Sequence, residues 1–413
     1  MDELDGTKYA REHACLEKFS ENIFEYGEGY AVNVLNELIE QGIEKRASDI
    51  HINPKSDHVE LRFRIDGSLR LISNIAADKI TSIISRLKVI SDMDIAENRL
   101  PQDGRCMFEY KGKRFDLRAA TVPTIFGEKA VIRILDKSNL GYSIETLGMS
   151  IAELERIKKS IGGSSGMILV SGPTGSGKTT TIYSILKHMN PENKNILTIE
   201  DPVEYIVENA SQIQVNKSKG LDFATGLRSI IRSDPDIIMV GEIRDAETAQ
   251  IAARAAMTGH LVLSSIHTND SASAVTRLVE MGIHPFMVAS SLRCVVAQRL
   301  VKKACQNCKQ EYRLPNEELT FFGIEDHCDC AFTRGQGCEK CFGTGYLGRV
   351  GVYEVMAIDS NIRDSINRGE SDAQIKRIAV ENGMKTILEN SVRLVRNGIT
   401  TFDEIAVFLN DKV

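Results

Sequence analysis

The sequence predicts a two-part α/β protein, in which a smaller α+β domain with an antiparallel sheet precedes a larger domain built on a mostly parallel sheet. At 413 residues the chain is too long for one ordinary hydrophobic core and should divide into domains. Residues 59–65 alternate between apolar and charged side chains, which indicates a strand with one solvated face. Short apolar runs alternate with helical patterns further along the chain, as in a parallel sheet covered on both faces; they are 168–170, 196–199, 237–240 and 261–266.

The composition is that of an ordinary globular protein, and it limits the classes of function. Hydrophobic residues make up 42% of the chain and charged residues 26%. No apolar run approaches the length needed to cross a bilayer, and the start Met1–Asp5 is acidic where a signal peptide would be basic. The net charge of −6 argues against a nucleic-acid groove as the main surface, although it leaves room for a local basic patch. We therefore expect a cytoplasmic protein.

The N-terminal part is expected to form the smaller domain. Residues 1–28 are polar and predict a flexible lead or the remnant of a docking region. Apolar residues at helical spacing from Tyr30 predict a helix that ends near Lys45-Arg46, and a second helix is expected at 78–91. Asp66-Gly67 is a hairpin signal. The strands expected in this domain are 48–52, 59–65, 68–72, 114–122 and 129–135.

The last two of these strands flank the loop Pro123–Glu128 and would place two arginines side by side. If Val122 pairs with Lys129, the register makes Arg118 and Arg133 cross-strand neighbours. Like charges opposite one another destabilise a sheet by up to about 1 kcal/mol, so the fold alone gives no reason for this pair. An anion bound between them would supply one. The alternative is two unrelated solvated arginines in a register shifted by one residue.

The larger domain is organised around a phosphate-binding loop. Gly172, Gly177, Lys178 and Thr179 stand at the spacing G-x-x-x-x-G-K-[ST], after an apolar strand and before a helix, flanks that a chance glycine-rich turn would lack. The glycines let backbone N–H groups and the helix N-terminus face an anion, while Lys178 reaches the β/γ-phosphates and Thr179 offers its hydroxyl to Mg²⁺. The sequence therefore predicts a site for ATP and Mg²⁺, made by Gly172, Pro173, Thr174, Gly175, Ser176, Gly177, Lys178, Thr179 and Thr180.

Two acidic clusters follow predicted strands, at the sheet edge where a nucleotide would lie. The first is Glu200-Asp201-Pro202-Val203-Glu204, and the second is Gly241-Glu242-Ile243-Arg244-Asp245. Gly241 stands where many phosphate-loop enzymes place the Asp that supports Mg²⁺, so Glu242 must take over this duty through a water molecule. Acidic residues at strand ends also serve as loop solubilisers or helix caps, but two such clusters behind a phosphate loop favour function.

Two histidines bracket the predicted strand 261–266. His267 follows the carboxyl end of this strand, where the nucleotide is expected, and is the candidate sensor of the γ-phosphate. His260 precedes the strand and is expected to serve packing.

Together these motifs resemble the ATPases of type II secretion and type IV pilus assembly. The phosphate loop, the clusters 200–204 and 241–245, the segment 258–269 and the N-terminal Ala47–His51 all match that family, over about residues 30–413. The resemblance implies a RecA-like P-loop NTPase domain preceded by a PAS-like domain, in a homohexameric motor that hydrolyses ATP bound between the two domains. It also implies an inner-membrane platform protein and a membrane-associated docking protein as partners, with the motor peripheral to the inner membrane.

The resemblance further implies roles for single residues. Glu204 would position or deprotonate the attacking water, and Glu242 would support Mg²⁺. Arg118 and Arg133 would act as arginine fingers that reach the γ-phosphate when the two domains close. Further arginines match family residues of structural or interface role, namely Arg228, Arg232 and Arg244.

Four of the nine cysteines form two C-x-x-C pairs, which predict a structural zinc site. Two such pairs supply four thiolates to tetrahedral Zn²⁺ with no open position, and a reducing compartment favours metal over disulfides. The pairs resemble the tetracysteine insertion of the secretion and pilus-extension branch of the family. The long gap between them contains Cys328-Asp329-Cys330, so the choice of pairs stays open, and reduced thiols are the alternative. The expected ligands are Cys305, Cys308, Cys338 and Cys341.

The expected boundaries follow from these motifs. They are a lead 1–28, a PAS-like domain 29–137, a linker 138–148, an ATPase core 149–300, a zinc module 301–348 and a helical C-terminal region 349–413. In the last region Ser371-x-x-Gln374 and Thr401-x-x-Glu404 predict helix starts.

Two other functions compete with that of a secretion or pilus motor. A nucleic-acid translocase on the same RecA-like core would need a basic channel that bears aromatic residues, whereas this chain has a net charge of −6 and no Trp. We therefore expect no nucleic-acid partner. A nucleotide-gated scaffold without hydrolysis is disfavoured by the presence of both Glu204 and Glu242. Secretion and pilus assembly are not separated by these motifs, and neither is the transported substrate.

Overall fold

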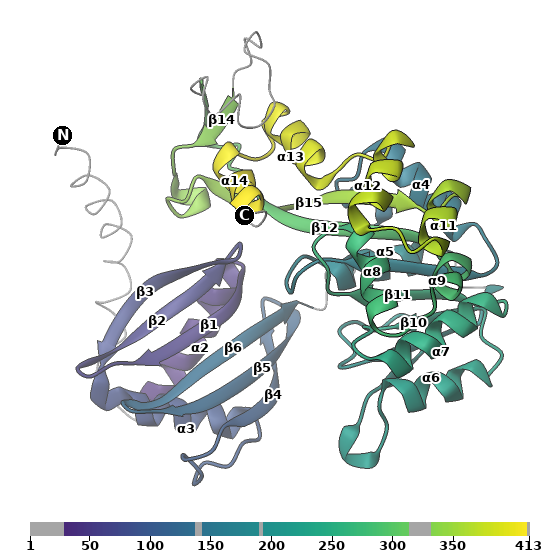
Figure 1. Cartoon of the computed structure of the whole chain (residues 1–413). Helices are drawn as coiled ribbons and strands as arrows, with labels where there is room; N and C mark the ends of the chain where they lie inside the picture. Colours follow the sequence, from purple (N-terminus) through teal and green to yellow (C-terminus); the bar gives the residue numbers. More distant parts are fainter. Residues whose placement is uncertain (1–28, 137–142, 190–192, 314–331, 411–413) are drawn as a thin grey trace. The chain divides into compact units, whose positions relative to one another are not determined.

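The computed structural model describes residues 29–136, 143–189, 193–313 and 332–410 (Figure 1). They form two compact units, one within Met1–Leu140 and Gln336–Leu347, the other within Gly141–Gly335 and Gly348–Val413. The expected lead 1–28, residues 138–142 of the expected linker, and Cys328 and Cys330 lie outside the described residues. Each unit buries hydrophobic side chains of its own.

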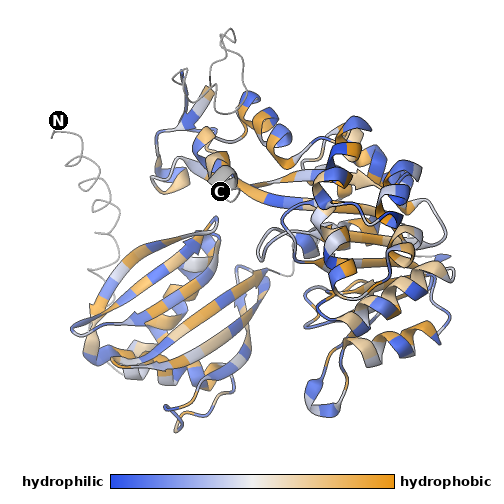
Figure 2. Ribbon diagram, viewed as in Figure 1, coloured by the Kyte–Doolittle hydropathy of each residue, from blue (hydrophilic) through white to orange (hydrophobic). Residues whose placement is uncertain are grey.

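The first unit is an antiparallel sheet with two helices on one face, which confirms the expected α+β fold. Its strand order is β3-β2-β1-β6-β5-β4, and each neighbouring pair is antiparallel. Helices α2 and α3 contribute Leu38 and Ile83 to a cluster with Phe63 of the sheet, and hydrophobic and hydrophilic residues alternate along the strands (Figure 2). The bounds are α2 Tyr30–Glu44, β1 Ala47–Pro54, β2 His58–Ile65, β3 Ser68–Ala76, α3 Ile80–Ile90, β4 Gln102–Tyr110, β5 Lys113–Thr124 and β6 Gly127–Asp136.

Two details of this sheet differ from the prediction. Strand β4 is missing from the prediction because it lies at the sheet edge and contains Gly104, a residue that usually weakens a strand. The glycine is needed there, since a Cβ atom would stand 2.2 Å from the carbonyl oxygen of Ser91. The β5–β6 turn is also tighter than the predicted loop, because pairing continues to Thr124 and Gly127.

The second unit is a seven-stranded sheet covered by helices on both faces, as the alternating apolar runs predict. Its strand order is β15-β12-β7-β11-β10-β8-β9, and the five pairs from β12 to β9 are parallel. The sheet bounds are β7 Gly166–Ser171, β8 Ile196–Glu200, β9 Ala210–Gln214, β10 Ile237–Val240, β11 Leu261–Ile266, β12 Leu292–Ala304 and β15 Tyr346–Ala357. The helix bounds are α4 Ile151–Ile161, α5 Lys178–His188, α6 Phe223–Ile231, α7 Ala246–Met257, α8 Ser271–Glu280, α9 Pro285–Ser291, α11 Ser360–Asn367, α12 Asp372–Glu381, α13 Ile387–Arg396 and α14 Phe402–Asn410.

Successive residues of the central strands enter different cores. Leu169 and Val240 pack with α6, α7, α8 and α9 on one face, whereas Ile168 and Met239 pack with α4 and α5 on the other. Strands buried on both faces therefore consist of apolar runs without alternation, which is why β7, β10 and β11 were predictable. Strand β12 was not, because Gln298, Arg299 and Lys302 interrupt its apolar pattern.

The C-terminal helices are held by side-chain caps at the expected positions. Ser371 Oγ accepts a hydrogen bond from the Gln374 amide at 3.3 Å, and Thr401 Oγ1 accepts one from the Glu404 amide at 3.4 Å. The Glu404 carboxylate in turn binds Lys302 Nζ at 2.9 Å, which ties α14 to β12. A small hairpin, β13 Lys309–Tyr312 with β14 Phe332–Gly335, completes this region. None of the described helices combines the length and the apolar character that a membrane crossing requires.

A buried ion pair fixes the edge of the first unit and gives a test of its packing. Lys88 on α3 is 1% exposed, and its Nζ lies 2.7 Å from the Glu128 carboxylate and 2.7 Å from the carbonyl oxygen of Glu97. Removing one partner leaves a buried charge uncompensated, which costs about 3–5 kcal/mol. We expect Lys88→Met to lower the opening free energy of the amides in β5 and β6 by about that amount, measured by hydrogen exchange.

The matched control is Lys111→Met, which removes an exposed ion pair with Glu44 in the same unit. It should leave the exchange rates nearly unchanged, because exposed pairs contribute little. Equal protection in both variants would contradict the structural importance of Lys88.

Candidate nucleotide site

The phosphate-binding loop joins β7 to α5 and closes over strand β12. Gly172 has a φ of 148°, and a Cβ atom there would stand 2.5 Å from the carbonyl oxygen of Gln298. The Gln298 side chain donates from Nε2 to the carbonyl oxygen of Ser176 at 2.5 Å. Strand β12 therefore holds the phosphate-binding loop through Gln298, and only glycine fits at position 172, where the loop comes closest to the backbone of β12. No sequence motif pointed to Gln298.

The loop has donors that suit a phosphate. The hydroxyl of Ser176 is buried and makes no hydrogen bond within the described part of the chain. Gly177 precedes α5 with a φ of 87°, which leaves the helix N-terminus facing the loop. Backbone N–H groups at a helix N-terminus, together with an unused buried hydroxyl, fit the phosphate groups of a nucleotide.

Lys178 lies within this loop. Its Nζ donates to the carbonyl oxygens of Gly172 at 2.8 Å and of Pro173 at 3.1 Å. The side chain is 9% exposed, and burial lowers its pKa to about 8, against the opposing effect of the Glu242 carboxylate. An ammonium group buried this deeply is stabilised by anionic groups, which the phosphates of a nucleotide would supply.

Parallel register brings the other predicted groups to the same edge of the sheet. Val240 of β10 pairs with Ile199 of β8 and with Ser264 of β11, while Ile266 of β11 pairs with Ser171 of β7. The segments that follow these strands therefore start at a common level. They carry the acidic cluster 200–204, Glu242, His267 and the phosphate loop.

His267 lies between the loop lysine and the second acidic cluster. Its Nδ1 is 3.5 Å from Lys178 Nζ, and its Nε2 is 3.5 Å from Glu242 Oε2. Arg244 Nη2 lies 2.5 Å from the other oxygen of Glu242. Lys178, His267, Glu242 and Arg244 thus form one chain of contacts at this edge of the sheet. The role of His267 as a sensor of the γ-phosphate stays a prediction.

The remaining predicted groups of this edge occupy distinct places. Glu204 is half-buried in the segment between β8 and β9. His260 lies at the opposite end of β11, with Nδ1 3.0 Å from the carbonyl oxygen of Ala255, so it is far from the phosphate loop along the strand. A hollow of about 400 Å³ lies beside the loop and is lined by Pro173, His267 and Arg277 among others.

A partly buried charge cluster next to the His267 segment had no sequence signal. Asp270 caps α8, and Lys376 of α12 donates to its Oδ2 at 2.7 Å. Lys376 also lies 3.8 Å from Glu354 of β15. Glu354 is 0% exposed and accepts from the Ser271 amide at 2.9 Å. The contacts of Ser271 with Glu354 and of Asp270 with Lys376 join residues more than 80 positions apart, which local patterns do not report.

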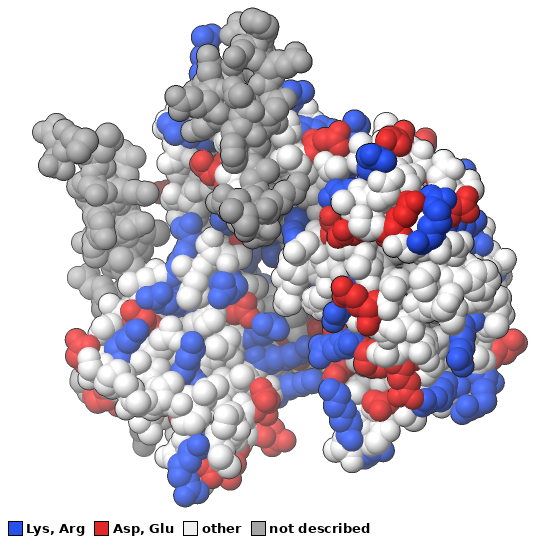
Figure 3. Space-filling model, viewed as in Figure 1, with Lys and Arg blue, Asp and Glu red and all other residues white. Residues whose placement is uncertain are grey.

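In the first unit, Arg118 and Arg133 pair across β5 and β6 as the predicted register requires. Arg105 pairs with Arg118 on the other side, so three arginines are neighbours on the face opposite the helices, where Lys and Arg side chains are visible in Figure 3. Arg133 Nε donates to Asp49 Oδ1 at 2.9 Å, yet the Arg133 side chain is 61% exposed. Asp49 thus supplies a structural counter-charge that the sequence prediction lacked.

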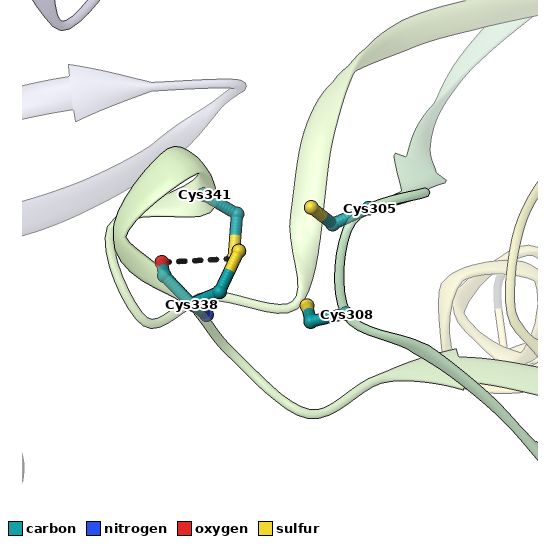
Figure 4. Close-up of side chains that lie close together, drawn as sticks. All are labelled: Cys305, Cys308, Cys338 and Cys341. Atoms are coloured by element: carbon teal, nitrogen blue, oxygen red, sulfur yellow. Dashed lines mark hydrogen bonds between the residues drawn. The ribbon is translucent and has the colours of Figure 1, made fainter.

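The four expected zinc ligands come together. One sulfur atom from each of Cys305, Cys308, Cys338 and Cys341 lies within 4.8 Å of the others (Figure 4). Tetrahedral zinc with Zn–S bonds of about 2.3 Å requires sulfur atoms about 3.8 Å apart, and Cys338 and Cys341 are 3.7 Å apart. The amides of Cys338 and Gly345 donate to Cys341 Sγ at 3.1 and 3.3 Å. Amide donors stabilise thiolates, so the donor set fits a structural Zn²⁺ ion.

Comparison with known proteins places these features in a family. The family model described as "Type II/IV secretion system protein" matches residues 25–407. The chain is 45% identical over 383 residues to the type IV pilus assembly ATPase PilB of Thermus thermophilus, covering 92% of this chain and 43% of that protein. It is 43% identical to type II secretion system protein E of Aeromonas hydrophila, covering 91% of this chain and 74% of that protein.

A solved structure agrees with this placement. The pilus retraction motor PilT with bound ADP is 26% identical, with a TM-score of 0.59 over 90% of this chain and 96% of that chain. The chain spans less than half of the Thermus relative and about three quarters of the Aeromonas relative. Because the family model covers most of the sequence and the relatives agree with it, this chain belongs to the type II/IV secretion system protein family.

Proposed function

We propose that this chain is a Mg²⁺-dependent ATPase that powers type II protein secretion or type IV pilus assembly. The observation that carries the proposal is the position of His267 within 3.5 Å of both Lys178 and Glu242, at the phosphate loop of a secretion-family chain. The name of the Thermus relative, a pilus assembly ATPase, supports it. In this proposal the protein works as a homohexamer in the cytoplasm, at the inner membrane, on a platform protein and beside a docking protein.

Each residue at this edge of the sheet has its own role in the proposed hydrolysis of ATP. The loop from Gly172 to Thr180 holds the phosphates of ATP, with Lys178 between the β- and γ-phosphates. Thr179 and, through a water molecule, Glu242 would hold Mg²⁺, which would supply positive charge to the phosphates when bound. Glu204 orients a water molecule and accepts its proton as the water oxygen attacks the γ-phosphorus. The bond to the bridging oxygen breaks, which yields ADP and inorganic phosphate, and His267 senses the γ-phosphate.

The proposal is tested by the ATPase rate in three settings. The assay compares the protein alone with two mixtures. One contains the platform protein in vesicles with acidic lipid, and the other contains single-stranded DNA. We expect the platform protein to stimulate hydrolysis and DNA to have no effect. Stimulation by DNA alone would instead favour a nucleic-acid translocase on the same fold.

Two variants run in the same assay separate binding from chemistry. Lys178→Ala should abolish nucleotide binding or turnover, whereas Glu204→Gln should keep binding and lose hydrolysis, because it removes only the proton acceptor. The controls are Lys187→Ala, at the far end of α5, and Glu208→Gln, exposed in the Glu204 segment. A wild-type rate for Glu204→Gln would remove Glu204 from the mechanism.

The arginine pair of the first unit gives a further prediction. We propose that Arg118 and Arg133 supply positive charge to the γ-phosphate in the transition state, in a closed conformation only. Replacing either with Ala should reduce turnover by about 10³-fold and leave nucleotide affinity nearly intact, since arginine fingers act in the transition state.

The matched control for the arginine pair is Arg114→Ala, an exposed arginine on the same strand β5. It should hydrolyse ATP at the wild-type rate. The measurement uses verified hexamers. Unchanged hydrolysis in both single variants would show that Arg118 and Arg133 take no part in catalysis.

The cysteine cluster predicts about one tightly held Zn²⁺ ion per chain. Metal analysis of purified protein should find this stoichiometry, and chelation should expose thiols and unfold the β13–β14 region, since structural zinc contributes folding free energy. Cys305→Ser should lose the metal. The control is Cys294→Ser, because Cys294 lies buried in β12 outside the cluster. Absence of metal, with all four thiols alkylated in the native protein, would rule the site out.

A further inference from the structure

Glu200, the first residue of the acidic cluster, is buried and fully hydrogen-bonded. It is 2% exposed at the end of β8. Its Oε1 accepts from Thr198 Oγ1 at 2.7 Å and from Gln212 Nε2 at 3.0 Å, and its Oε2 accepts from the hydroxyl of Tyr183. All of these donors are neutral side chains. Both oxygens of this carboxylate are occupied by protein donors, so we assign Glu200 an indirect part in the site.

Two of the three donors to Glu200 lie on elements other than its own strand β8. Tyr183 lies on α5, the helix that begins at Lys178 of the phosphate loop. Gln212 lies on β9, at the edge of the sheet. Glu200 therefore connects the phosphate-loop helix, the end of β8 and the edge strand through side chains alone.

Tyr183 and Gln212 also contact the chain next to Glu204. Gln212 Nε2 lies 2.9 Å from the carbonyl oxygen of Tyr205, and Gln212 Oε1 accepts from the Val207 amide at 2.8 Å. The Tyr183 ring packs edge-to-face on the Tyr205 ring, with centroids 5.6 Å apart and an interplanar angle of 79°. The residue that follows Glu204 is thus held from the helix side and from the strand side.

Burial makes this arrangement sensitive to the loss of one donor. Burial, together with the Glu200 carboxylate, raises the pKa of Tyr183, so its hydroxyl remains a donor. A buried carboxylate oxygen left without a donor pays its full desolvation cost, so the cluster would rearrange rather than stay in place. Because Tyr205 adjoins Glu204, such a rearrangement moves the group that handles the attacking water.

We propose that Tyr183 and Gln212 are positioning residues for ATP hydrolysis: through Glu200 and Tyr205 they fix the Glu204 carboxylate relative to the phosphate loop. The inference rests on the proposed role of Glu204. It assigns the two residues no contact with nucleotide. Misplacing a catalytic group by about 1 Å costs up to about 10²-fold in rate.

The test replaces the hydroxyl of Tyr183 and keeps its ring. Tyr183→Phe should lower kcat by about 10-fold or more, while KM and the affinity for a fluorescent ADP analogue stay within about twofold. Tyr353→Phe is the matched control, since Tyr353 is also buried in the second unit. Its hydroxyl reaches the carbonyl oxygen of Leu147 at 3.3 Å and the Thr181 side chain of the same helix α5, but not the Glu204 segment. This variant should keep the wild-type kcat. Gln212→Leu, a change on the edge strand, should reproduce the Tyr183→Phe pattern.

A double-variant cycle separates this inference from the proposed function. In the Glu204→Gln background, Tyr183→Phe should cause no further loss of kcat, because it acts through Glu204. If Glu204→Gln alone turned over at the wild-type rate, the role of Glu204 would be wrong and the inference would fall with it. If Glu204→Gln were slow, the inference alone would be overturned by a wild-type kcat in Tyr183→Phe and Gln212→Leu, or by an undiminished effect of Tyr183→Phe in the double variant.

Discussion

Parallel pairing in register is the constraint on which the candidate nucleotide site depends. Because β7, β11, β10 and β8 end at a common level, the segments after them meet at one edge although they lie far apart in the sequence. A shift of one residue in any pair would turn the buried side chains of that strand to the opposite face. The two cores on the sheet faces therefore hold the site in place as firmly as they hold the fold.

The electrostatics of the site follow from that edge. Lys178 is buried and donates to the carbonyl oxygens of its own loop. The carboxylate that acts on it, Glu242, is shared with Arg244 and His267. The lysine is therefore only partly compensated, and its lowered pKa reflects this. The binding free energy of such a site is most favourable for a ligand that carries several negative charges, as a nucleoside triphosphate does.

Sequence alone predicts those parts of the site that are local along the chain. The phosphate loop, the strand ends and the Arg118–Arg133 register depend on neighbouring residues or on one hairpin, so motif and alternation were sufficient. The residues that hold these site residues in place could not be predicted from the sequence. Gln298 under the loop, Asp49 beside Arg133 and Gln212 beside Tyr205 each come from an element placed there by the tertiary fold, and nothing in their own surroundings in the sequence marks them.

The carboxylate of Glu354 does more than balance Lys376. Its Oε1 accepts from the first amide of α8 at 2.9 Å, and its Oε2 accepts from the first amide of α13 at 3.2 Å. One anion on β15 thus serves as a common cap for two helices, whose positive N-termini converge on it. If either helix shifts, the fully buried carboxylate loses one of these hydrogen bonds, which costs free energy. The positions of α8, α13 and β15 are therefore coupled through Glu354. The segment after β11, which leads into α8, is thereby linked to the C-terminal helix α13 through a single side chain.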